Sequence, residues 1–94
     1  MRIFPSIPVS SGSSTSIGAA ASARGEGSTA IGYNTKVYQN GSYSTALGNS
    51  AKTENHSRAV AIGNASNAAN DNSIAIGTNA VTSRDGEMNI GAGT

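Results

Sequence analysis

Six Ile-Gly or Leu-Gly pairs recur along the chain at nearly even spacing, and this repeat constrains the fold more than any other feature. The pairs are Ile17-Gly18, Ile31-Gly32, Leu47-Gly48, Ile62-Gly63, Ile76-Gly77 and Ile90-Gly91. Successive pairs lie 14, 16, 15, 14 and 14 residues apart. A fixed period in a short chain indicates a repeat architecture. This period is too short for a helix pair but fits two short strands and two turns, so the sequence predicts an all-β solenoid.

The residues just before each glycine indicate a strand that is apolar on both faces. With the Ile or Leu as position 0, positions −2 and 0 share one strand face and position −1 takes the other. A strand that is apolar on both faces is buried on both. One face can close the coil's own interior, whereas the other needs an external cover, for which a symmetric partner chain is economical. The residues assigned to this core or trimer interface are Ile17, Ile31, Leu47, Val60, Ile62, Ile74, Ile76 and Ile90.

A tight turn and a second strand are expected after each pair. Glycine at position +1 in every copy indicates a positive φ or a backbone too crowded for a Cβ atom. These turn glycines are Gly18, Gly32, Gly48, Gly63, Gly77 and Gly91. Positions +4 and +6 are small or β-branched while position +5 is mostly polar, which predicts a strand with one wet face and a thin, flattened roll. Asparagines that follow the glycines, which tolerate left-handed backbone, are Asn34, Asn49, Asn64 and Asn79.

Composition favours a single oligomeric domain. The chain has 94 residues, of which 12% are charged, and large apolar side chains are few. A domain of this size buries a modest fraction of its surface even when well packed, and oligomerisation is a common remedy. We therefore expect an obligate oligomer. Disorder is the alternative for so polar a chain, but a disordered linker has no reason to keep its aliphatic residues in phase.

Several classes of function lack support in the sequence. The six basic residues are scattered, whereas nucleic-acid binding needs a basic patch. No apolar run is long enough to span a membrane, and Pro5 interrupts an apolar start that could resemble a secretion signal. His56 lies in a polar loop, and Asp85 and Glu87 lack the spacing of a calcium-binding loop. We expect no enzymatic activity, no cofactor and no metal.

The repeats resemble the head repeats of YadA-like trimeric autotransporter adhesins. Asn72-Ser73-Ile74-Ala75-Ile76-Gly77 matches the family's signature fully, and Ser28-Thr29-Ala30-Ile31-Gly32 matches its core. The first and last copies depart most, because they lack the alanine. The resemblance covers about residues 12–94. It implies a left-handed parallel β-roll of about six coils that forms an obligate homotrimer, with the inner strands packed around a three-fold axis.

Residues 1–11 lie outside the repeat and form an N-terminal arm, which leaves residues 12–94 as the roll domain. Prolines in this segment favour an extended path. Its apolar residues, which form a candidate docking arm, are Ile3, Phe4, Ile7 and Val9. Either the arm caps the open sheet edge of the first coil, or it docks on another protein by strand addition or apolar anchoring.

Two functions fit these features. The first is a structural protein on a virion exterior, which decorates or stabilises a capsid or forms a short fibre and attaches through the arm. The second is the head fragment of a bacterial trimeric autotransporter adhesin, located on the outer surface of the cell and binding host matrix or cells. The short chain and its apolar arm favour the first. The longest coil supplies a candidate contact loop formed by Tyr33, Lys36, Tyr38 and Tyr43.

Overall fold

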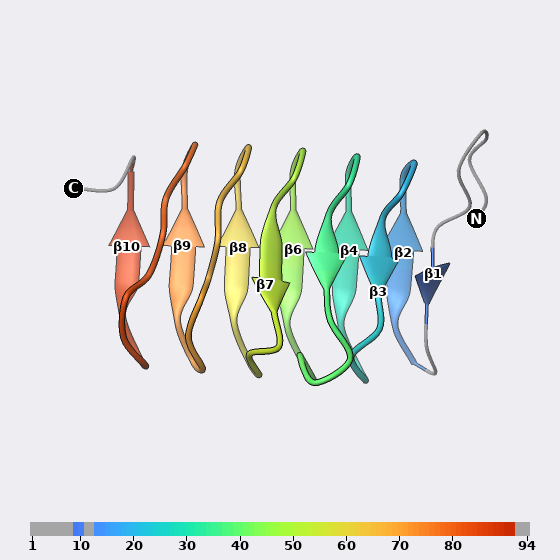
Figure 1. Ribbon diagram of the computed structural model, residues 1–94, viewed down its shortest axis with the longest axis horizontal. Helices are drawn as coiled ribbons and strands as arrows, with labels where there is room; N and C mark the ends of the chain where they lie inside the picture. Colours follow the sequence, from blue (N-terminus) through green and yellow to red (C-terminus); the bar gives the residue numbers. More distant parts are fainter. Residues whose placement is uncertain (1–8, 11–12, 92–94) are drawn as a thin grey trace.

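The structure, a computed structural model, describes residues 9–10 and 13–91, which form strands and turns without a helix. One sheet contains six parallel strands stacked along the long axis of the molecule (Figure 1). In chain order they are β2 (Thr15–Ile17), β4 (Thr29–Ile31), β6 (Thr45–Leu47), β8 (Val60–Ile62), β9 (Ile74–Ile76) and β10 (Met88–Ile90). Each strand ends at the residue before a repeat glycine, as the sequence predicts.

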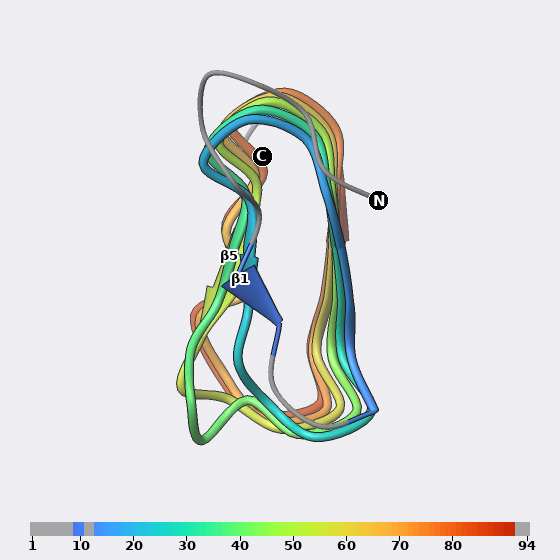
Figure 2. The same cartoon turned by 90° about the vertical axis from the view of Figure 1, so that its right-hand side faces the viewer.

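A second, four-stranded sheet forms the opposite wall of the roll. Its strands are β1 (Val9–Ser10), β3 (Ser22–Ala23), β5 (Lys36–Val37) and β7 (Lys52–Glu54), in that order. Single parallel bridges from Lys52 to Asn67 and from Asn67 to Val81 continue the wall toward the C-terminal end. Viewed along the stack, the coils superpose as a narrow ring (Figure 2). The Cα atoms extend over 36 × 22 × 12 Å, which agrees with the thin roll that the sequence predicts.

Equivalent residues of successive repeats stack directly on one another. In the six-stranded sheet Ala30 pairs with Ala46, Ala46 with Ala61, and Ala61 with Ala75, all in parallel. The 16- and 15-residue copies keep this register in the six-stranded sheet. In the other sheet the register shifts by one residue, because Lys36 pairs with Lys52 but Val37 pairs with Glu54. The parallel solenoid is therefore confirmed, with about five turns rather than six, since the last copy contributes only β10 within the described residues.

The interior of the roll is lined by alanines, and this corrects the core assignment in part. Ala30, Ala46, Ala61 and Ala75, at position −1, are fully buried. The Ile, Leu and Val side chains at positions −2 and 0 point to the other face, where the chain itself leaves them half-buried or exposed. The reason is thickness, because only small side chains fit between two walls this close together. These aliphatic residues therefore do not form the core of the single chain.

The opposite wall contributes the other half of the interior, as predicted. The residues at positions +4 and +6 are at most 2% exposed. They are Ala21, Ala23, Thr35, Val37, Ala51, Thr53, Ser66, Ala68, Ala80 and Thr82. Small and β-branched side chains thus meet the alanine row across the roll and close it.

The turns after β2, β4, β6 and β8 require glycine for two reasons. Gly63 has a φ of +127°, and a Cβ atom added there would lie 2.8 Å from the carbonyl of Gly77 in the next coil. Two residues further on, a second left-handed position recurs at Ala20, Asn34, Ser50, Ala65 and Asn79. The expectation for the turn asparagines thus holds for Asn34 and Asn79. It is wrong for Asn49 and Asn64, which precede the left-handed residue.

Buried serines at position −3 support the second turn in three of the coils, and they are Ser28, Ser44 and Ser73. Ser44 Oγ donates to the carbonyl of His56 at 2.7 Å and accepts the N–H of Ala59 at 3.1 Å. Ser73 Oγ donates to the carbonyl of Asn70 at 2.6 Å. Asn72, which precedes Ser73, adopts a left-handed φ of 57°. The Asn-Ser part of the repeat signature therefore forms a turn residue and its internal support.

Replacing Ser44 with alanine should destabilise the roll. The change leaves the carbonyl of His56 and the N–H of Ala59 without their partner in the interior, which costs about 1–3 kcal/mol. Chemical denaturation of the purified protein measures this change. Ser57→Ala is the matched control, because its Oγ makes only an exposed bond to the carbonyl of Asn40, and it should shift stability by less than about 0.5 kcal/mol. Equal effects would remove the internal role assigned to Ser44.

Replacing Ser16 with alanine should have the opposite sign. Ser16 occupies the alanine position of the first coil, is 6% exposed, and its Oγ has no hydrogen-bond partner among the described residues. Alanine removes this unpaired hydroxyl and continues the row begun by Ala30, so we expect a gain of about 1 kcal/mol. The same denaturation measurement tests it, and a loss of stability would indicate that the hydroxyl has a partner in solution.

Candidate interaction surfaces

The outward face of the six-stranded sheet is a continuous aliphatic surface. It is formed by Ile17, Ile31, Leu47, Val60, Ile62, Ile74, Ile76, Met88 and Ile90, with Thr15, Thr29 and Thr45 completing the rows. None of these side chains is charged, and exposure reaches 37% at Ile31 and 64% at Ile90. Contiguous apolar patches on soluble chains mark interaction sites. We refer to this surface as the aliphatic face.

The N-terminal segment is described in part. Val9 and Ser10 pair in parallel with Ser22 and Ala23, so the backbone of β1 covers the edge of β3. This pairing is the arrangement expected of a cap on the first coil. Ile3, Phe4 and Ile7, the other members of the candidate docking arm, lie outside the described residues. The boundary between an arm at residues 1–11 and a roll at residues 12–94 stays a prediction.

The candidate contact loop does not form one surface. Tyr33 lies in the turn between β4 and β5, whereas Tyr43 follows β5 at the opposite end of the coil. The ring of Tyr43 covers Gly27, where an added Cβ atom would lie 2.8 Å from it. Lys36 and Tyr38 lie together on the wall formed by the four-stranded sheet, which we call the outer wall. The four residues are therefore split between the two ends and one side of the coil.

Lys36 and Tyr38 instead line a groove on the outer wall. The groove has a volume of about 570 Å³, runs along β3 and β5, and reaches the residue after β7. Its polar lining consists of Ser22, Arg24, Lys36, Tyr38, Gln39 and Asn55. Arg24, Gln39 and Asn55 come from three successive coils, and no sequence motif marks them. Only the stacking of the coils brings them together.

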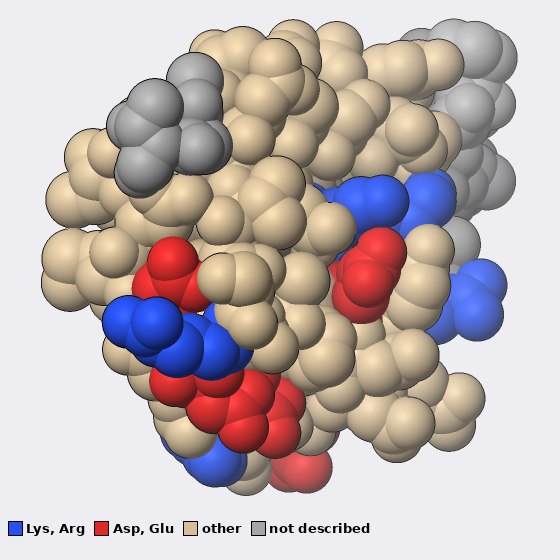
Figure 3. Space-filling model, turned by 60° about the vertical axis from the view of Figure 1, so that its left-hand side comes forward, with Lys and Arg blue, Asp and Glu red and all other residues tan. Residues whose placement is uncertain are grey.

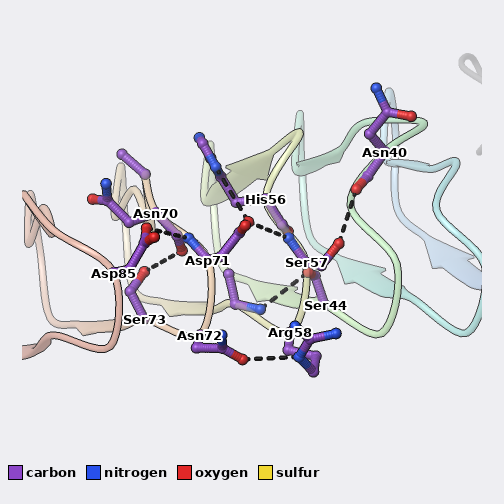
Figure 4. Close-up of polar contacts among 12 residues, drawn as sticks. Asn40, Ser44, His56, Ser57, Arg58, Asn70, Asp71, Asn72, Ser73 and Asp85 are labelled. Atoms are coloured by element: carbon purple, nitrogen blue, oxygen red, sulfur yellow. Dashed lines mark hydrogen bonds and ion pairs between the residues drawn. The ribbon is translucent and has the colours of Figure 1, made fainter.

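The loops that follow the outer wall are joined by a ladder of polar contacts (Figure 4). Asp71 Oδ1 accepts the N–H of Ser57 at 2.9 Å and lies 3.6 Å from Nδ1 of His56. One coil later, Asp85 Oδ1 accepts the N–H of Asp71 at 3.2 Å. Arg58 Nε donates to the side-chain oxygen of Asn72 at 2.8 Å. These carboxylates and amides therefore hold together the turns of neighbouring coils.

Glu87 has a similar local role. The backbone N–H of Ser83 donates to Glu87 Oε1 at 2.6 Å and lowers the pKa of this exposed carboxyl below its ordinary value. A carboxyl with a lowered pKa stabilises the folded state above its ordinary pKa, and this contribution is lost as the pH falls. Among the residues that the structure describes, no three His, Asp or Glu side chains gather closely enough to hold a metal ion.

The rest of the visible surface carries few charges. Acidic and basic side chains lie together in groups, and the surface between these groups is largely uncharged (Figure 3). Lys52 Nζ, for example, lies 3.3 Å from Glu54 Oε2. Over the described part of the chain, no helix has the length and apolar character needed to cross a membrane.

Comparison with known proteins agrees with this architecture. The stacked parallel coils define a β-solenoid protein, and one of its sheets carries the uncharged aliphatic face. The family model for the YadA head domain repeat matches residues 10–35, 40–56 and 57–80, which together exceed half of the chain. The chain therefore belongs to the YadA head repeat family, which confirms the resemblance inferred from the sequence. The comparison with curated proteins gave no match.

Proposed function

We propose that this chain forms a non-enzymatic, left-handed, homotrimeric β-roll that is displayed on an exterior surface as a structural and adhesive head. The observation that carries the proposal is the aliphatic face, which runs the length of the six-stranded sheet and which the described part of the chain does not cover. Three such faces that meet around one axis would bury one another. The turn-supporting role of the polar clusters fits a structural rather than a catalytic protein.

An adhesin-type head is the setting that we favour. The family match is to a head domain repeat, and the outer wall opposite the aliphatic face stays accessible when that face is buried. Such a head would lie on the bacterial outer surface and contact host matrix or cells. Attachment to a virion exterior is the second candidate, and it rests on the apolar character of Ile3, Phe4 and Ile7.

Two binding assays on the purified chain test the setting. We expect the full chain and a variant lacking residues 1–11 to be retained equally on a surface coated with extracellular matrix, and neither to sediment with virus capsids. Sedimentation of the full chain alone with capsids would establish the virion setting instead. A chain that binds neither matrix nor capsids would contradict the proposed function.

A further inference from the structure

The groove on the outer wall is lined by polar side chains, several of which make no side-chain hydrogen bond or ion pair with the described part of the chain. Its volume of about 570 Å³ lies within the range of small-molecule sites, which is about 300–1,000 Å³. Ser22, which is 9% exposed, lies on β3, one of the two strands along which the groove runs. The lining therefore combines a nearly buried residue of β3 with longer side chains from the following coils.

The groove is positively charged. Arg24 and Lys36 line it, and no carboxylate belongs to the lining. Across the described residues, neither cation has an acidic group within ion-pair distance, whereas Lys52 on the neighbouring strand lies 3.3 Å from Glu54. Two unpaired cations in one groove provide charge-assisted hydrogen bonds for an anion.

Amides and an aromatic ring complete the lining. The side-chain amides of Gln39 and Asn55 make no hydrogen bond within the part of the chain that the structure describes, so both their donors and their acceptors stay free. Tyr38 presents an exposed ring and a phenolic hydroxyl beside them. Free amides suit the hydroxyl groups of a sugar, which both donate and accept, and an aromatic ring suits the apolar face of a pyranose.

We infer that this groove binds a sugar that carries a carboxylate or sulfate group. Arg24 and Lys36 hold the anionic group, Gln39 and Asn55 bond the ring hydroxyls, and Tyr38 packs against the sugar ring. An acidic peptide fits less well, because extended peptides bind by pairing with a free strand edge. Here β3 is already paired with both β1 and β5, and β5 with both β3 and β7.

The inference deepens the proposed function by naming a ligand class for the outer wall. It rests on the proposed function only in that the outer wall must face outward in the assembled protein. The groove lies on the four-stranded wall. This wall stands opposite the six-stranded sheet (Figure 2). All of its named residues belong to one chain, so binding at the groove can be measured apart from trimerisation. Failure of binding and failure of trimerisation are therefore separate results.

Titration of the ¹⁵N-labelled full chain with short sugars tests the inference, and the native mass of each sample is recorded alongside. The probes are tri-galacturonic acid, which supplies carboxylates, and a chondroitin sulfate tetrasaccharide, which also supplies sulfate; maltotetraose is the neutral control. We expect at least one acidic sugar to shift the amide signals of residues 20–24, 36–39 and 55, and maltotetraose to leave them unchanged.

Variants localise the site. Arg24→Gln combined with Lys36→Gln should weaken binding at least about tenfold through loss of two charge-assisted bonds, and Tyr38→Ala should weaken it about threefold or more. Lys52→Gln, the matched control on the same wall, should change it less than about twofold, because its cation is paired with Glu54. Absence of shifts at the groove, an equal loss with Lys52→Gln, or equally tight binding of hexaglutamate would each overturn the inference.

Discussion

Replacing Ile62 with aspartate will abolish assembly of the chain. Ile62 lies in the middle of the aliphatic face, half-buried by its own chain and flanked by Leu47 and Ile76 in the neighbouring strands. In a trimer built on this face, each subunit would bury an unpaired carboxylate. An isolated buried charge costs several kcal/mol or more, and three copies multiply the cost. Sedimentation equilibrium or native mass spectrometry measures the assembled fraction directly.

The matched control uses the opposite wall. Val81 is an apolar residue that is 46% exposed on the outer wall, and Val81→Asp should leave both assembly and stability nearly unchanged. Ile76→Asp repeats the test one coil further along and should behave like Ile62→Asp. A soluble, folded trimer from either aspartate variant of the aliphatic face would show that this face is not the interface.

Replacing Gly63 with alanine will destabilise the roll by more than about 3 kcal/mol. The φ of +127° is strained for any residue with a Cβ atom. That atom would also lie 2.8 Å from backbone atoms of Gly77, which cannot move without breaking the register of the stack. Thermal or denaturant unfolding should show the loss. Gly63→Val will lower the stability further, but the Cβ atom that alanine already has will account for most of the loss.

Gly86→Ala measures the cost of a milder positive φ without crowding between coils. Gly86 also has a positive φ, of +76°, but an added Cβ atom would meet nothing within 4 Å. It should therefore lose only about 1 kcal/mol, the ordinary penalty for a left-handed alanine. Equal losses at Gly63 and Gly86 would show that backbone crowding between coils contributes nothing.

The sequence was sufficient to predict the architecture because the same residue pattern recurs in every coil. Period and alternation predict the solenoid and its two walls, and the small residues at positions +4 and +6 predict the thin interior. Alternation alone does not say which strand face turns inward. In the structure Ala61 is buried inside the roll, whereas Ile62 lies on the aliphatic face. The closeness of the walls decides between them, since isoleucine is too large for the space.

The groove could not be predicted in the same way. Arg24, Gln39 and Asn55 are separated by 15 and 16 residues and form no motif along the chain. They meet because the coils stack in register and because each lies just after a strand of the outer wall. The buried serines were missed for a related reason, because nothing in the sequence marks Ser44 as buried. Only the stacked loops show that it bonds backbone groups 12 and 15 residues away.

The mass of the native chain in solution tests the central claim most directly. If the aliphatic face of each subunit is buried against two copies, analytical ultracentrifugation of the purified protein will give a single species of three times 9.3 kDa at micromolar concentration. A folded, monodisperse monomer at that concentration, with the aliphatic face open to solvent, would contradict the account.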